Sequence, residues 1–194
     1  EHRIVAGNDV RWVREISNFE YDANGIATSA VGIVQDITEQ RTANESLSKL
    51  GLAAEQSPSA IIITNTHSEI EYVNACFVDS TGYTKEETLG RNADFLRSGN
   101  VPDAIYAELF ATLRQGRAWS GELSHRRKNG EEYLDYSHIA PIRQADGSIT
   151  HYLTIQEDIT EKKRVAAELD QYRHHLEDLV FSRTAELEQA RQQA

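Results

Sequence analysis

The sequence predicts an α+β domain with a five-stranded antiparallel sheet and short helices, followed by a long C-terminal helix. Between residues 57 and 160, apolar runs bounded by turn residues occur in the order two strands, helical segments, three strands. The tetrapeptide Asp-Ile-Thr-Glu occurs at 36–39 and again at 158–161, each time between a strand-like run and a charged helical run. Helical periodicity then continues over 161–194.

The repeated tetrapeptide predicts a duplicated domain. The copies are 158 − 36 = 122 residues apart, and their surroundings match in kind, GIATSAVGIVQDITEQR and GSITHYLTIQEDITEKK. Solenoid repeats have periods of about 20 to 50 residues, so this spacing indicates a whole domain. We therefore expect residues 1–38 to be the C-terminal strands of a first domain that lacks its front half, and residues 57–160 to be a complete domain.

In the first segment, residues 10–16 and 29–35 are expected to form two strands joined through the turn Asp22-Ala23-Asn24-Gly25. Two strands cannot hold a core. The segment therefore either packs on another chain or is an incomplete domain, and we favour the second interpretation. Residues 39–56 carry a narrow apolar stripe with helical spacing and are expected to form a linker helix, capped by Thr38 or Asp36.

The complete domain is predicted to begin with a hairpin formed by residues 60–64 and 70–74. Short helical pieces punctuated by glycines fill residues 75–99, and a longer helix follows Pro102 and ends near Gly116. The last three strands are predicted at residues 119–127, 132–142 and 149–156, with turns at Asn129-Gly130 and Asp146-Gly147.

The C-terminal helix carries one apolar seam with steps of three and four residues. Its members are Leu169, Tyr172, Leu176, Leu179 or Val180, Arg183, Leu187, Ala190 and Ala194. A helix with a single seam is not stable alone, so we predict a parallel homodimeric coiled coil, weakened by Arg183. In the alternative, part of the helix folds back on its own domain.

Composition excludes several function classes. The chain has 31 acidic and 20 basic residues and a net charge of −11, which disfavours nucleic-acid binding. No apolar run approaches the ~18 residues of a membrane span, so we expect no direct membrane contact and a cytoplasmic location. The single cysteine, Cys76, excludes an internal disulfide, and its apolar neighbours predict a packed side chain.

Several short motifs resemble a known family. Residues 52–161 contain, in this order, the motifs YVN, TGYT, LGRN, RRKNG and DIT. This stretch resembles a PAS sensor domain, in which such motifs occur in the same order. The segment ending GIVQDITEQR is similar to the last strands of a preceding PAS domain. The resemblance implies a sheet curved around a small pocket and a sensory role, with no catalytic residues in the fragment.

The C-terminal helix adds a second resemblance. LEDLVFSRTAELEQARQQA is similar to the linker that carries PAS signals into sensor histidine kinases, which implies a kinase domain in cis. His174-His175-Leu176-Glu177 lacks the acidic residue and nearby proline of a phosphoacceptor box, so these histidines are expected on a solvated helix face.

The resemblance leaves the cofactor open. Light-oxygen-voltage domains place a reactive cysteine after Gly-x-Asn, where this chain has Ala93, so that thiol chemistry is absent. Residues 96–133 resemble FAD-binding redox sensors, but Ile62, Ala93 and His125 stand where that branch tends to have other polar groups. FAD is therefore one alternative and no cofactor the other. The candidate pocket residues are Ile62, Phe77, Asn92, Ala93, Leu96, Phe110, Trp119 and His125.

Haem and metal sites are not expected. Haem-binding relatives place a histidine on the long helix, and residues 102–115 contain none. His67, His125, His138 and His151 have no second ligand at metal-like spacing. Trp119 is expected either to stack on a flavin or, by default, to pack in the core.

Three functional hypotheses remain. The first is a sensory module of a histidine kinase, in which Asp36, Thr38, Asp158 and Thr160 join each sheet to its following helix. The second is an FAD redox sensor, and the third is a cofactor-free dimerisation module.

Overall fold

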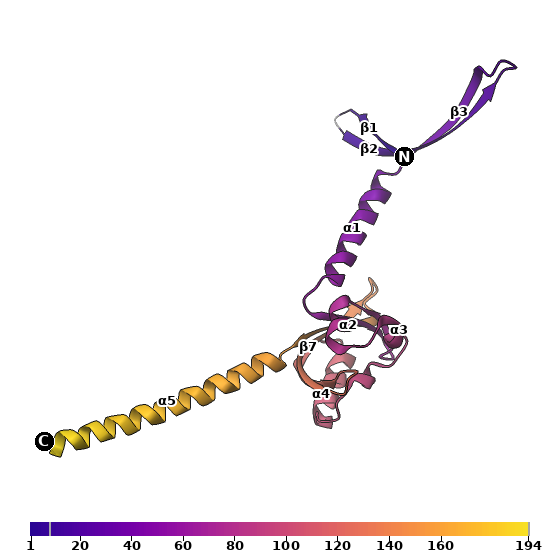
Figure 1. Cartoon of the computed structure of the whole chain (residues 1–194). Helices are drawn as coiled ribbons and strands as arrows, with labels where there is room; N and C mark the ends of the chain where they lie inside the picture. Colours follow the sequence, from indigo (N-terminus) through magenta and orange to yellow (C-terminus); the bar gives the residue numbers. More distant parts are fainter. Residues whose placement is uncertain (8, 194) are drawn as a thin grey trace. The chain divides into compact units, whose positions relative to one another are not determined.

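The computed structural model describes residues 1–7 and 9–193, but not the side chains of residues 185, 188–190, 192 and 193. Of the seam positions, the side chain of Ala190 and the whole of Ala194 therefore lie outside the described part of the chain. The chain forms two compact units, Glu1–Ala54 and Glu55–Ala194 (Figure 1).

The first unit is a three-stranded antiparallel sheet followed by a helix. Its elements are β1 (His2–Ala6), β2 (Asp9–Tyr21), β3 (Ala27–Asp36) and α1 (Thr38–Glu55), with strand order β1-β2-β3. We predicted two strands here and missed β1, whose five exposed residues pair through the backbone with β2 and have no buried face to give a pattern. The predicted turn is present, since the Asp22 carboxylate accepts the backbone N–H groups of Asn24 and Ile26.

The second unit contains the predicted five-stranded antiparallel sheet, in the order β5-β4-β8-β7-β6. The strands are β4 (Ala60–Asn65), β5 (Ile70–Val73), β6 (Trp119–Arg126), β7 (Glu132–Arg143) and β8 (Ile149–Asp158). Their bounds differ from the predicted ones by no more than two residues. The sheet places the C-terminal strand β8 at its centre, between β4 and β7.

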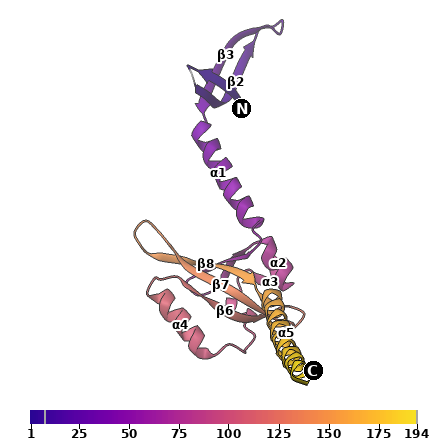
Figure 2. The same ribbon diagram turned by 90° about the vertical axis from the view of Figure 1, so that its left-hand side faces the viewer.

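Short helices cross over between β5 and β6. They are α2 (Ala75–Thr81), α3 (Lys85–Thr88), the 3₁₀ helix η1 (Ala93–Leu96) and α4 (Asp103–Arg114). Side chains cap the first three: Asn74 accepts from Phe77 N–H, Thr84 forms a capping box with Glu87, and Asn92 accepts from Asp94 N–H. Pro102 is the N-cap of α4 rather than its first helical residue. Figure 2 shows α4 lying along one face of the sheet.

Two apolar clusters form the core of the second unit. One surrounds Phe77 and contains Ile62, Ile70, Val73 and Leu96. The other joins α4 to β6 and contains Tyr106, Leu109, Leu113, Trp119 and Leu123.

The two copies of the repeated tetrapeptide make the same hydrogen bonds. In the first unit, Ile37 N–H donates to the Trp12 carbonyl at 2.8 Å, and Trp12 N–H donates to Thr38 Oγ1 at 2.8 Å. In the second unit, Ile159 N–H donates to the Leu134 carbonyl at 2.9 Å, and Leu134 N–H donates to Thr160 Oγ1 at 2.9 Å. Each threonine thus fastens the start of a helix to the neighbouring strand.

The register of the strands is also repeated. Val13 pairs with Asp36, and Asp135 pairs with Asp158. Both pairs are related by the 122-residue offset, since 135 − 13 and 158 − 36 both equal 122. β2 and β3 therefore repeat the pairing of β7 and β8.

Helix α5 (Thr160–Gln193) begins directly at the second copy. Ile159 is buried at its start, and Lys163 forms a 2.7 Å ion pair with Glu122 on β6. Farther along, the described apolar seam is exposed, from Leu169 to Leu187, so these side chains do not fold back on their own domain. Within residues 1–7 and 9–193, no helix is both long and apolar enough to cross a membrane.

Candidate functional site

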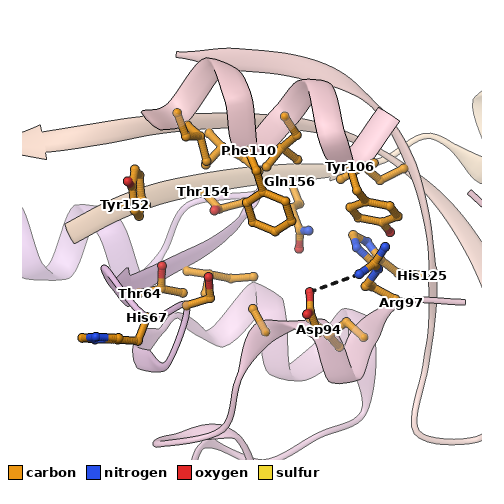
Figure 3. Close-up of a pocket in the computed structure, with 18 of the residues that line it drawn as sticks. Thr64, His67, Asp94, Arg97, Tyr106, Phe110, His125, Tyr152, Thr154 and Gln156 are labelled. Atoms are coloured by element: carbon orange, nitrogen blue, oxygen red, sulfur yellow. Dashed lines mark ion pairs between the residues drawn. The ribbon is translucent and has the colours of Figure 1, made fainter. Parts of the chain in front are cut away.

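A cavity of about 370 Å³ lies between the sheet and the helices η1 and α4 (Figure 3). Both core clusters border the cavity. Its apolar wall is formed by Ile62, Leu96, Leu109, Leu113, Leu123 and Ile139. Pockets for small molecules measure about 300 to 1,000 Å³ and combine apolar walls with a few polar groups. The volume is at the lower end of this range.

Five of the eight predicted pocket residues line the cavity: Ile62, Ala93, Leu96, Phe110 and His125. Phe110 is 37% exposed, and Figure 3 shows its ring pointing from α4 into the space. The other three lie elsewhere, because each has a structural partner of its own.

Phe77 is fully buried in the neighbouring apolar cluster. Asn92 caps η1 and donates from its amide to the His67 carbonyl. Trp119 packs against the α4 side of the core, and its ring leaves no room for a side chain at position 121, where a Cβ would meet it at 2.5 Å. Gly121 is therefore required by the packing of Trp119, which favours the core-packing interpretation of this tryptophan.

Most of the polar side chains that line the cavity were not among the predicted pocket residues. Thr64, Tyr106, Thr154 and Gln156 line the cavity and are mostly buried. The available signal was the period of two on β8, which puts Thr154 and Gln156 on the same face of the sheet. Polar residues at inward-facing positions of a central strand indicate a polar interior.

A buried hydrogen-bonded network crosses three strands behind the cavity. His125 Nδ1 on β6 contacts Asp135 Oδ2 on β7, and Asp135 is completely buried. Ser137 Oγ donates to the other carboxylate oxygen at 2.7 Å, and Gln156 Nε2 on β8 lies 3.4 Å from Ser137 Oγ. A buried carboxylate is stable only with such partners.

Two buried side-chain oxygens in the described part of the chain have no hydrogen-bond partner, Gln156 Oε1 and the Tyr106 hydroxyl. Leaving such a group unpaired costs about 1 to 3 kcal/mol. Burial raises the pKa of Tyr106, and the nearby Arg97 opposes the shift. The Arg97 guanidinium lies over the tyrosine ring, 3.4 Å from its centroid. The cavity therefore offers unused polar groups in an apolar setting.

Cys76 takes no part in the cavity wall. Its thiol donates to the Pro58 carbonyl at 3.1 Å, and burial raises its pKa. Ala93 does line the cavity. Neither position can therefore present a thiolate to a ligand in the cavity. No group of histidine, cysteine and acidic side chains suited to a metal ion occurs among the described residues.

The joint to α5 shares its two strands with the cavity. Gln156 lies two residues before Asp158 on β8, and Asp135 follows Leu134 on β7. Burial alone would raise the pKa of Asp158, but hydrogen bonds from Thr160 and Arg127 outweigh it, and the pKa is lower than usual. Residues of the cavity wall and of the buried network are therefore close neighbours in sequence of the residues bonded to the helix start.

Arg127 adds a second connection. Its guanidinium donates to Asp158 and to the Ser80 carbonyl, and it lies over the Tyr133 ring at 4.3 Å. The Tyr133 ring is 5.9 Å from that of His125, which lines the cavity. Arg127 thus ties α2 and the joint to the neighbourhood of the buried network.

Comparison with known proteins places these observations in a family. The PAS domain profile matches residues 58–161. The nitrogen fixation regulatory protein of Klebsiella oxytoca is 37% identical over 106 residues, and the aerotaxis receptor of Escherichia coli (strain K12) is 33% identical over 105. These alignments cover 55% and 54% of this chain and 21% of each relative, so the chain spans about a fifth of their length.

A blue-light-activated histidine kinase of Rhizobium johnstonii is 30% identical over 128 residues, which cover 64% of this chain and 37% of the relative. Among solved structures, the PAS domain of a Colwellia psychrerythraea protein has a TM-score of 0.56 and 26% identity, covering 60% of this chain and 98% of that one. The fold, the cavity and the profile match agree, and this chain belongs to the PAS domain family.

Proposed function

We propose that this chain is a sensory input module in which occupancy of the cavity changes the Asp158–Thr160 joint and, through it, the packing of helix α5. The observation that carries the proposal is that cavity and joint are built on the same two strands. Leu134 holds Thr160 through its backbone, and its neighbour Asp135 belongs to the network behind the cavity. PAS relatives include a histidine kinase and regulatory and aerotaxis proteins, which supports a signalling role.

In the same proposal, residues 1–38 are the last strands of a first PAS domain, and α1 leads from that domain into the next. The support is the repeated register of β2 with β3 and the equal set of hydrogen bonds at Thr38 and Thr160. The exposed seam of α5 pairs with the same helix of a second chain and leads to a kinase domain in cis. The support is the exposure of the seam and the similarity to a histidine kinase.

A flavin is the second part of the proposal, as an alternative to a cavity without a cofactor. A solved light-oxygen-voltage domain described with a flavin analogue is 25% identical, with a TM-score of 0.54, covering 66% of this chain and 96% of that one. The polar edge of such a ring needs hydrogen-bond donors and acceptors. The cavity offers the unpaired oxygens of Gln156 and Tyr106 and the hydroxyls of Thr64 and Thr154. A bound flavin would supply redox or light-absorbing chemistry, while these residues would bind and orient its ring.

The experiment is an absorption spectrum of natively purified protein, followed by mass spectrometry of the denatured sample. Flavin bands with a released flavin of matching mass support the redox-sensor form of the proposal. A colourless protein that also fails to take up added FAD excludes it, and a released colourless molecule then identifies a different ligand for the same module. A Gln156→Leu variant serves as the cavity control, because it removes the unpaired oxygen and should weaken retention of a polar ligand.

A further inference from the structure

The orientation of the Gln156 side-chain amide, and so the direction in which its unpaired oxygen points, depends on the hydrogen bonds of the residues next to it. Its side chain is 6% exposed, and Figure 3 shows its amide pointing into the space near Phe110, Tyr106 and Asp94. An amide has one donor end and one acceptor end, and a half turn about its last bond exchanges them. Which end faces the cavity therefore decides what kind of ligand group can bind there.

The network behind the cavity fixes this choice. Asp135 Oδ1 accepts a hydrogen bond from Ser137 Oγ, and Asp135 Oδ2 contacts His125 Nδ1. Ser137 has a single hydroxyl proton, and the 2.7 Å bond to Asp135 uses it. Ser137 can then only accept from Gln156, which must turn its NH₂ group toward Ser137 and its oxygen away.

We propose that Asp135, although it does not line the cavity, is a positioning residue that sets the hydrogen-bonding polarity of the site. With these hydrogen bonds from Gln156 through Ser137 to Asp135 (the relay) intact, the cavity presents the Gln156 oxygen and selects ligands that carry an N–H or O–H donor at that place. The inference rests on the proposed function, because it assumes that the cavity is a ligand site. It goes further by naming the chemistry of the ligand edge and a buried residue that controls it.

The Asp135→Asn substitution reverses the relay without changing its size. His125 Nδ1–H still donates to the new amide oxygen, but the new NH₂ group donates to Ser137 Oγ. The Ser137 hydroxyl is then free to donate to Gln156, whose oxygen turns toward it. The cavity now presents NH₂ in place of oxygen, so its preference for donor-bearing ligands is lost.

Indole and benzofuran test this directly, because they have nearly the same shape and differ in carrying a ring N–H or a ring oxygen. Binding is followed by ¹H–¹⁵N spectra of the full chain, using cavity backbone amides and the side-chain NH₂ of Gln156. The original protein should bind indole about 2- to 12-fold more tightly than benzofuran, the net effect of one hydrogen bond. In Asp135→Asn the ratio should fall to one or below, with a changed shift of the Gln156 NH₂ group.

Three variants complete the design. Ser137→Ala breaks the relay but keeps the His125–Asp135 pair, so it should also abolish the preference and remains informative if Asp135→Asn does not fold. Gln156→Leu should bind both probes with a ratio of one. The surface substitution Asp79→Asn makes the same chemical change outside the network and should keep the original ratio.

Equal affinity for the two probes in the original protein, or an unchanged preference in Asp135→Asn and Ser137→Ala, overturns this inference while leaving the cavity as a ligand site. Failure of both probes to bind overturns this inference, whereas the proposed function is tested separately by the spectrum and mass spectrometry of the purified protein.

Discussion

Replacing Asp158 by alanine tests the joint between the sheet and α5. The Asp158 carboxylate accepts the Thr160 N–H at 2.9 Å and pairs with the Arg127 guanidinium. The substitution removes both interactions at once and leaves Arg127, whose side chain is only 18% exposed, with a weaker set of partners. Loss of a side chain that accepts a backbone N–H at the start of a helix costs about 1 kcal/mol, and loss of a partly exposed ion pair costs up to about 1 kcal/mol. We therefore expect the second unit to lose about 2 kcal/mol of its free energy of unfolding.

The matched control is Asp146→Ala. Asp146 also accepts from a residue two positions ahead, the Ser148 N–H at 2.9 Å, but it has no cationic partner and lies in an exposed turn. It should lose less than about 1 kcal/mol. The difference between the two variants isolates the contribution of the joint.

The assay is urea unfolding followed by tryptophan fluorescence. The chain has two tryptophans, and a Trp12→Phe background leaves Trp119 as the reporter of the second unit. Equal midpoints for Asp158→Ala and Asp146→Ala, at unchanged slopes, would refute the reasoning, because the joint would then be no stronger than an exposed turn.

Two further predictions follow from the same structure. The pKa of Asp158 is lower in the folded than in the unfolded state, so its contribution to stability is present above the unfolded pKa, near 3.8, and is lost as the pH falls through the folded value. The difference in free energy of unfolding between the original protein and Asp158→Ala should therefore shrink in acid. A constant difference from pH 7 to 2.5 would contradict this. Replacing Arg183, which is exposed and paired with Glu186 at 2.7 Å, by leucine should complete the apolar seam and tighten self-association in sedimentation experiments. An unchanged dissociation constant, with Arg173→Leu outside the seam as control, would exclude this position from a dimer interface.

Much of the fold could be predicted because local patterns determine it. Turn residues at Asn129-Gly130 and Asp146-Gly147 separated the last three strands, and the five-stranded sheet is confirmed. The repeated tetrapeptide correctly located the change from strand to helix in both units, since Asp36 and Asp158 each accept from the threonine two residues ahead. These interactions lie within a few residues of sequence.

The polar side of the cavity could not be predicted in the same way. The sequence predicts His125 as a pocket residue, but its partner Asp135 is on the next strand, and Gln156 reaches the same network from a third. Such partners depend on the register between strands, which no local pattern gives.

The central claim is that cavity occupancy reaches the start of α5. The most direct measurement is an indole titration in which the backbone amides of cavity residues Thr154 and Gln156 are compared with those of Ile159, Thr160 and Lys163. Both groups of amides should shift with the same apparent dissociation constant, while the Gly147 turn stays unchanged. Shifts confined to the cavity, with no response at the three joint amides, would contradict it.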